Sequence, residues 1–364
     1  MKEVGISYLD KFEFNSIYFE ITSKCNGKCS YCYNNSSQDG RHIPVETIMD
    51  TMKQAYQINP NMSFVFSGGE PLLHPNLLEI LNFANVHNLN STVITNASLI
   101  GAKSFALALN KCNIQVTLES LNQKEHDLIR GLCSFDNIRN LQKTIPNVFK
   151  LKRILRVNLT RNNIEYIKEF AEFAIKNEFN VLSFGFLVKQ GRGQNSTDII
   201  DYEDDREIWT NTIKEIKKIS KLYGEKLIVE RKNCYPKVGC ELTYLKNPSM
   251  AVRIDAEGYV FPCLYFFDKQ HSIGNILDKS LADILKGESF LALVNVLLHR
   301  ENNILSCKQC IWDKQCRKGC PALAYSKYKT INEKESCGFL KDTFEKAIKS
   351  ERLKAKGIGG DFNL

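Results

Sequence analysis

A chain of 364 residues with 43% hydrophobic and 25% charged residues can bury the core of two domains, or of one large barrel with an appendage. Its formal charge of +8 comes from basic residues spread along the chain, so a solvated basic surface explains it better than a nucleic-acid site does. The N-terminus has no apolar signal-peptide run, and the longest apolar run, residues 290–298, is too short for the ~20 residues of a membrane span. We therefore expect a cytoplasmic protein with no membrane partner.

The predicted elements of residues 16–223 alternate between short β-like runs and amphipathic helical segments. The predicted strands cover residues 16–22, 62–67, 91–95, 113–119, 153–160 and 181–188, and the predicted helices cover residues 45–58, 76–87, 103–109, 163–176 and 204–222. This alternation predicts βαβ units and a parallel sheet. Six units are two fewer than a full eightfold barrel has, so the expected fold is α/β, a partial (β/α)6 TIM-like barrel.

The pattern changes after Tyr223, where strand–helix alternation stops and cysteines recur from Cys234 to Cys337. Residues 250–263 predict a hairpin that turns at Glu257-Gly258. We expect a second domain stabilised by metal. The predicted division is an N-terminal extension over 1–15, the barrel over 16–225, the cysteine-rich domain over 226–340, and a helix and tail over 341–364.

Thirteen cysteines in a cytosolic chain indicate metal rather than disulfides. Three of them form Cys25-x3-Cys29-x2-Cys32, directly after the first predicted strand. Three thiolates this close can bind three irons of a 4Fe–4S cluster, and the absence of a nearby fourth cysteine leaves one iron open to another ligand. Zinc is the alternative for clustered cysteines.

A second motif, Gly68-Gly69-Glu70-Pro71, follows the second predicted strand. The two glycines let the backbone approach a ligand, and the carboxylate can accept hydrogen bonds from an ammonium group. The motif falls at the carboxyl end of its strand and beside the cysteine loop, which is where parallel barrels place their active sites.

The two motifs together resemble the radical S-adenosylmethionine (radical SAM) superfamily. The resemblance implies that a cluster on the three cysteines binds S-adenosylmethionine (SAM) through its open iron, and that reductive cleavage gives a 5′-deoxyadenosyl radical. It implies that Gly68, Gly69 and Glu70 hold the methionyl amino group and that Arg130 pairs with the methionyl carboxylate. The other implied SAM contacts are Tyr31 and Tyr33 beside the adenine, and the strand-end residues Asn96, Thr117 and Glu119, the last replacing the family's usual aspartate.

The C-terminal cysteines resemble the SPASM extension of radical enzymes that mature peptides and sulfatases. They are Cys307-x2-Cys310-x5-Cys316-x3-Cys320, then Cys337, with Cys234, Cys240 and Cys263 upstream. The resemblance implies two auxiliary 4Fe–4S clusters and three clusters in all. It assigns Cys234, Cys240, Cys263 and Cys320 to one auxiliary cluster, and Cys307, Cys310, Cys316 and Cys337 to the other. The gap from Cys240 to Gly258 is longer than usual, so we expect an insertion around Tyr244–Ser249.

Two cysteines remain, Cys112 and Cys133, and both can be small buried hydrophobes. Alternatively, Cys133, which follows Arg130, donates a hydrogen atom to a substrate radical, as epimerases of this superfamily do.

The reaction is inferred from a departure from the family pattern. Sulfatase-maturing relatives have an aspartate directly after the cysteine of Pro-Cys, whereas this chain has Leu264 there. Leucine cannot act as a base, although Asp268 or another acid could substitute. Full ligation of both auxiliary clusters leaves no iron for a substrate, which favours a role as electron conduits. We therefore expect oxidative cross-link formation on a ribosomally made peptide.

The alternatives are a radical dehydrogenase of a protein side chain or small molecule, a peptide epimerase, and a non-catalytic zinc or iron–sulfur module. About fifteen residues precede the first predicted strand, so a leader-binding domain is expected on a separate protein, if the peptide needs one. A flavodoxin or ferredoxin is expected as electron donor.

Overall fold

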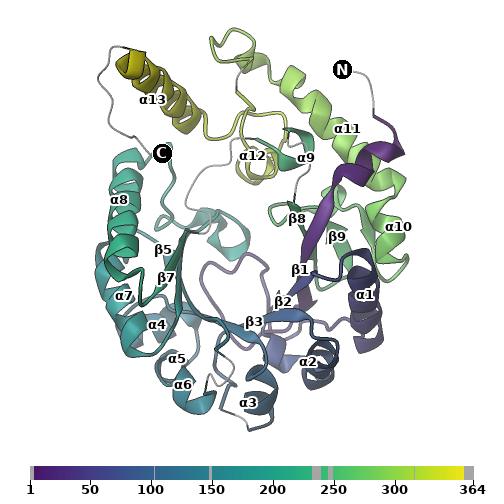
Figure 1. The fold of residues 1–364 in the computed structure, drawn as a ribbon, viewed down its shortest axis with the longest axis vertical. Coiled ribbons are helices and arrows are strands. Elements are labelled where there is room, and N and C mark those ends of the chain that lie inside the picture. Colours follow the sequence, from purple (N-terminus) through teal and green to yellow (C-terminus); the bar gives the residue numbers. More distant parts are fainter. Residues whose placement is uncertain are drawn as a thin grey trace.

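The computed structural model describes residues 4–101, 103–146, 150–231, 239–244, 249–314 and 316–355. Its centre is one ten-stranded sheet with the order β10-β9-β8-β1-β2-β3-β4-β5-β6-β7 (Figure 1). Seven strands pair in parallel and in chain order, namely β1 (Glu13–Thr22), β2 (Ser63–Gly68), β3 (Asn90–Thr95), β4 (Asn113–Thr117), β5 (Arg153–Leu159), β6 (Val181–Phe186) and β7 (Ile228–Arg231). The six predicted strands are confirmed, and β7 adds a parallel strand that the sequence pattern did not predict.

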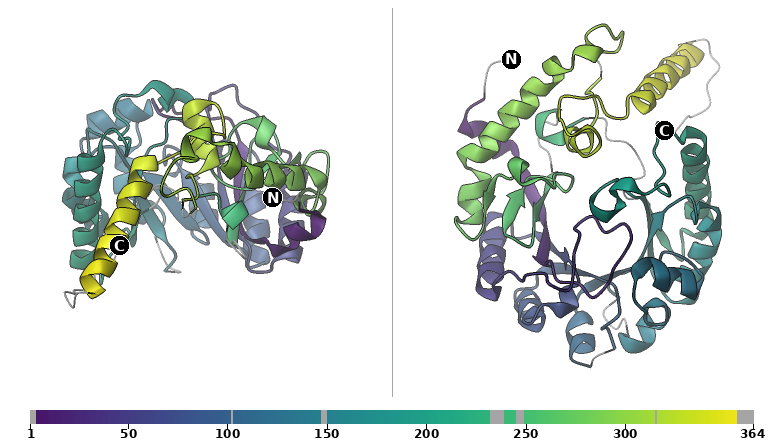
Figure 2. Two further views of the ribbon diagram at one scale, coloured as in Figure 1. Left: turned by 90° about the horizontal axis from the view of Figure 1, so that it is seen from above. Right: turned by 180° about the vertical axis from the view of Figure 1, so that it is seen from behind.

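Helices cover the outer face of the curved sheet (Figures 1 and 2). Those between the parallel strands are α1 (Val45–Ile58), α2 (Leu77–Val86), α3 (Lys103–Leu109), α4 (Gln123–Arg130), α5 (Phe135–Arg139), α6 (Leu141–Thr144), α7 (Ile167–Lys176) and α8 (Arg206–Tyr223). Short 3-10 helices lie at η1 (Ile6–Lys11), η2 (Pro71–Leu73), η3 (Ile164–Tyr166), η4 (Gly191–Asn195), η5 (Lys269–His271) and η6 (Leu305–Cys307). All residues of β6 are buried, as expected where helices cover one face of a strand and the barrel interior covers the other.

The cysteine-rich half extends this sheet. Strand β8 (Ser249–Ile254) pairs in parallel with β1, and it forms an antiparallel hairpin with β9 (Tyr259–Phe261), which in turn pairs with β10 (Gly274–Asn275). The predicted hairpin is therefore present, and Gly258 adopts a φ of +86° at its turn. Strands β10 and β7 are the two edges, so the sheet is open within the residues that the structure describes. The domain boundaries proposed from the sequence remain predictions.

The remaining helices are α9 (Glu241–Tyr244), α10 (Leu281–Leu285), α11 (Glu288–Asn303), α12 (Pro321–Tyr328) and α13 (Cys337–Ala355). The apolar run at 290–298 lies in α11, where Phe290, Val294 and Leu297 are buried against the rest of the chain. Within the described ranges, no helix combines the length and apolar content that crossing a membrane requires. The expected insertion around Tyr244–Ser249 falls largely on residues 245–248, outside the described residues.

Candidate active site and cysteine centres

The loop after β1 carries Cys25, Cys29 and Cys32, all half-buried. Two distant segments hold this loop in place. The N–H of Lys28 donates to the carbonyl of Arg130 at 2.9 Å, at the end of α4. From η4, Arg192 donates its Nε to the carbonyl of Cys29 at 2.8 Å. No local motif predicts this role of Arg192, because its partners are the backbone carbonyls of Cys29 and Ser36.

The glycine motif packs directly against the cysteine loop. The N–H of Gly69 donates to the Thr22 carbonyl at 2.7 Å, and the N–H of Glu70 donates to the Lys24 carbonyl at 2.8 Å. A Cβ on Gly69 would lie 2.2 Å from the Lys24 carbonyl oxygen, and Gly68 has a φ of +120°. Glycine is therefore required here because two loop backbones touch, whether or not a ligand is bound.

Glu70 is fully buried, and its carboxylate joins three elements. Oε1 accepts from the N–H of Leu72 at 3.1 Å and from Oγ1 of Thr95 at 2.7 Å, and Oε2 accepts from the N–H of Asn96 at 2.7 Å. Burial raises the pKa of Glu70, and these hydrogen bonds oppose the rise. The carboxylate thus anchors the ends of β2 and β3, and its contact with a methionyl amino group remains a prediction.

Asn96 also reaches the cysteine loop, since its Nδ2 donates to Oδ1 of Asn26 at 2.9 Å. Thr117, at the end of β4, is buried. Both residues therefore lie at carboxyl ends of strands, as the sequence analysis expected of SAM contacts. Their contact with SAM remains a prediction.

Arg130 is the common neighbour of the predicted SAM contacts. Its Nη1 lies 3.2 Å from Oε1 of Glu119; the Glu119 side chain is buried and that of Arg130 is 12% exposed. Burial alone lowers the pKa of Arg130, but negative charge on Cys29 and Glu119 raises it above its usual value. Its Nε is buried and has no hydrogen-bond partner within the described part of the chain. A buried guanidinium with one unpartnered N–H fits a ligand carboxylate.

The two predicted adenine contacts have different surroundings. Tyr31 lies beside Glu119 and Arg130, where burial raises the pKa of its hydroxyl well above the usual value. Tyr33 donates its hydroxyl to Oε1 of Glu20 at 3.0 Å, and its ring centroid lies 5.4 Å from that of Phe267 in the cysteine-rich half. The stacking of both rings on an adenine remains a prediction.

Glu20 forms a buried ion pair that the sequence analysis missed. Nε and Nη2 of Arg253 each lie 2.9 Å from one carboxylate oxygen of Glu20, so the pair is bidentate and joins β1 to β8. The guanidinium also donates to the carbonyl of Phe266 at 3.1 Å. A charged residue within the apolar part of each strand, in Tyr18–Ile21 of β1 and in Met250–Ile254 of β8, was the available signal.

The first auxiliary set brings together the three of its four cysteines that the structure describes. Burial raises the pKa of Cys240 to about 12, and the next contribution comes from the neighbouring thiol of Cys263. The pKa of Cys320 rises well above its usual value, first from burial and then from Cys263. Cys234, the fourth predicted ligand, lies outside the described residues.

The second auxiliary set lies around one small cavity of about 20 Å³, lined by Cys307, Cys310, Cys316 and Cys337 together with basic and aromatic side chains. The N–H of Lys318 donates to Sγ of Cys316 at 3.3 Å. Four sulfur donors around one cavity fit an iron–sulfur cluster.

Among the described residues, no three Cys, His, Asp or Glu side chains converge on the site of a single ion. Each thiolate of a 4Fe–4S cluster binds a different iron, so such ligands need not converge. Of the two cysteines outside the three sets, Cys112 is buried and Cys133 is exposed.

Residues 19–174 match the Radical SAM superfamily, and residues 240–311 match the SPASM iron–sulfur cluster-binding domain. The chain is a radical SAM enzyme with a SPASM domain. The radical SAM match spans β1 to α7 and includes the cysteine loop, the glycine motif and Arg130. The SPASM match includes Cys240, Cys263, Cys307 and Cys310.

The chain is similar to a sulfatase-maturating enzyme and to a bacteriocin biosynthesis protein, and its fold is similar to that of a crystal structure with a bound precursor peptide. The cysteine-type anaerobic sulfatase-maturating enzyme of Clostridium perfringens is 24% identical over 90% of this chain and 94% of that protein. The subtilosin biosynthesis protein AlbA of Bacillus subtilis is 27% identical over 73% of this chain and 58% of that protein. Streptococcus suis SuiB, in its crystal structure with the precursor peptide SuiA, has a TM-score of 0.69 at 18% identity, covering 89% of this chain and 76% of SuiB.

Proposed function

We propose that this radical SAM–SPASM enzyme modifies a ribosomally made peptide by oxidative cross-linking of a side chain. The observation that carries the proposal is the second auxiliary set, in which four cysteines surround one cavity in addition to the set at Cys240, Cys263 and Cys320. Two separate sulfur sets beyond the SAM site suit a reaction that must remove an electron from a substrate radical. Relatives that act in bacteriocin biosynthesis or bind a precursor peptide support a peptide as substrate.

In this proposal, the residues around the three-cysteine loop bind the cluster and SAM, and the auxiliary sets remove the electron. When bound, the three-cysteine cluster and SAM supply a 5′-deoxyadenosyl radical that abstracts a hydrogen atom. Arg130, whose Nε has no partner among the described residues, is assigned the methionyl carboxylate. Glu70 holds the loops of β2 and β3 in register, so that Gly68 and Gly69 stay against the cysteine loop.

The residue directly after Cys263 favours cross-linking over sulfatase-type dehydrogenation. Leu264 stands where sulfatase-maturing relatives have an aspartate, and it cannot take a proton. Asp268 is the nearest substitute in sequence, but its Oδ1 accepts from the N–H of Gln270 at 3.1 Å and its Oδ2 accepts from the hydroxyl of Tyr325 at 3.0 Å. The geometry therefore gives Asp268 a structural role as cap of η5.

The proposal is tested with anaerobically reconstituted protein, dithionite, SAM and a precursor peptide encoded beside its gene. The wild type is expected to form 5′-deoxyadenosine and a peptide that has lost two hydrogen atoms, with a cross-link visible by tandem mass spectrometry. Cys29→Ala is expected to abolish both products, whereas the control Cys112→Ala, at a buried thiol bonded to the Leu109 carbonyl, is expected to keep them. A peptide whose mass is unchanged in H2O but rises by about one dalton per modified residue in D2O would instead indicate epimerisation, with Cys133 as hydrogen donor.

A further inference from the structure

The second auxiliary set lies close to a basic part of the surface. Its cavity is lined by three basic residues (Lys318, Lys334 and Lys341) and two acidic ones (Asp313 and Glu335), as well as by its four cysteines. Lys318 is buried and is held by Oδ1 of Asp313 at 2.7 Å. Lys334 is half-buried and Lys341 is exposed, so positive charge extends from the sulfur atoms to solvent.

The loop that carries three of these cysteines is compact. The N–H of Cys310 donates to the carbonyl of Cys307 at 2.9 Å, and the N–H of Cys316 donates to the carbonyl of Trp312 at 2.8 Å. Lys308, Ile311 and Lys314 each lie within two residues of a cysteine of this set in the chain. The exposed side chains of this loop therefore belong to surface beside the sulfur set.

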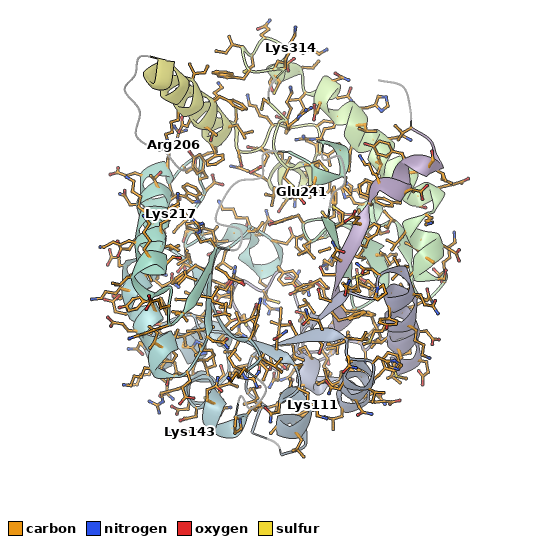
Figure 3. The ribbon with its side chains drawn as sticks, viewed as in Figure 1. Lys111, Lys143, Arg206, Lys217, Glu241 and Lys314 are labelled. Atoms are coloured by element: carbon orange, nitrogen blue, oxygen red, sulfur yellow. The ribbon has the colours of Figure 1, made fainter. Side chains whose placement is uncertain are left out.

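Four exposed residues define what we name the exit surface: Leu305, Lys308, Ile311 and Lys314. Ile311 is 85% exposed, more than any other large apolar side chain in the described residues, and Leu305 is 72% exposed. Single exposed apolar side chains are common on soluble proteins, so the charge of this loop decides which partner could dock there. Figure 3 places Lys314 at one end of the molecule and Lys111 and Lys143 at the opposite end.

We propose that the exit surface docks an acidic one-electron carrier protein, which takes the electron that the reaction releases. This inference rests on the proposed oxidative function. For each peptide modified, the substrate radical loses one electron to the auxiliary centres, and the oxidised carrier gains that electron. The second auxiliary set is thereby returned to its starting state.

The net positive charge of the loop favours an acidic protein as the partner of the exit surface. Residues 305–319 contain four basic residues and one acidic residue, Asp313, which is paired with Lys318. A second copy of the same surface would be repelled by like charges, whereas an acidic carrier is steered towards it. Redox partners bind through small interfaces of less than about 1,200 Å², so a patch of a few lysines around two apolar side chains is of suitable size.

The test measures binding of a purified acidic 2Fe–2S ferredoxin, in its oxidised form, to the reconstituted holoprotein by titration calorimetry. The site variant carries Lys308→Glu and Lys314→Glu. The matched control carries Lys111→Glu and Lys143→Glu, which make the same change in net charge at two exposed lysines of the opposite end. Iron content and 5′-deoxyadenosine formation with dithionite are measured for both variants, because neither pair belongs to the SAM site.

The site variant is expected to weaken ferredoxin binding by about tenfold or more at low ionic strength, and the control by less than about twofold. The difference should shrink at ~0.5 M salt, where screening acts over a few ångströms. Equal weakening in both variants would overturn the exit surface, as would loss of self-association in the site variant without loss of ferredoxin binding. Product formation with a small chemical oxidant tests the proposed function separately, since it needs no docked protein.

Discussion

His126 is a buried histidine whose ring contacts the backbone of Glu119, one of the predicted SAM contacts. It is completely buried on α4, where its Nδ1 accepts from the N–H of Glu119 at 3.1 Å and its Nε2 lies 3.0 Å from Oγ of Ser134. An accepting Nδ1 means that the neutral ring carries its proton on Nε2. Burial, with a smaller effect of the Arg130 charge, lowers the pKa of His126 to about 4.

This shift predicts a pH dependence of stability. Between the folded pKa of about 4 and the unfolded value of 6.5, the unfolded chain binds more protons, so this contribution is complete above pH 6.5 and is lost as pH falls towards 4. The expected loss between pH 7 and pH 4.5 is about 2 to 3 kcal/mol. The measurement is the slope of the free energy of unfolding against pH, which should be shallower in His126→Asn than in the wild type. Identical slopes would show that His126 does not titrate in this way.

Gly69 gives a second prediction at the residue scale. Gly69→Ala places a methyl group 2.2 Å from the Lys24 carbonyl oxygen, so the cysteine loop must move. We expect the reconstituted variant to lose about four irons, those of the SAM cluster, and to form no 5′-deoxyadenosine. Gly101→Ala is the control, because nothing lies within 4 Å of its new Cβ. Full iron content in Gly69→Ala would mean that the contact between the two loops is not needed for cluster binding.

At the scale of elements, the bidentate pair of Glu20 and Arg253 adds a buried side-chain link to the backbone pairing of the barrel strand β1 with the SPASM strand β8. Arg253→Met leaves a buried carboxylate without its counter-charge and is expected to cost about 3 to 5 kcal/mol of stability. Adding Glu20→Gln should recover part of that loss, which a double-mutant cycle on the free energy of unfolding measures. Additive losses would argue against a direct coupling.

Strands and helices can be predicted from the sequence where buried apolar residues recur at a regular spacing. The six predicted strands were recognisable because each buries apolar residues, as β1 does with Ile17 and Phe19. Strand β7 was missed because it has four residues and its Ile228 is 57% exposed. Helix α4 was missed because His126 is its one buried residue, so it shows no apolar period.

The parts of the candidate site that have a local sequence signal were predictable, and the parts that depend on long-range contacts were not. Cysteine spacing and strand-end position are local signals, so they located the cysteine loop and the glycine motif. The partners of these groups depend on the folded chain. Arg192 and the Cys29 carbonyl that it binds are 163 residues apart in the sequence, and Arg253 and Glu20 are 233 residues apart. No local sequence pattern can predict such contacts.

At the scale of the whole molecule, the three cysteine sets predict the metal content. We expect about 12 irons per chain after anaerobic reconstitution, and about 8 when Cys25, Cys29 and Cys32 are all changed to Ala. Iron and zinc are measured together by mass spectrometry. A wild type with about 4 irons, or with stoichiometric zinc, would contradict the assignment of two auxiliary clusters.

The central claim is that the auxiliary sets remove an electron after SAM cleavage, and one paired measurement tests it most directly. Cys320 neighbours Cys263 and Cys240, whereas Cys337 neighbours Cys307 and Cys316, so Cys320→Ala and Cys337→Ala damage different sets. In folded protein, 5′-deoxyadenosine and modified peptide are quantified side by side. The account predicts that 5′-deoxyadenosine formation survives in both variants while modified peptide falls by about tenfold or more. Full yield of modified peptide in both variants would contradict it.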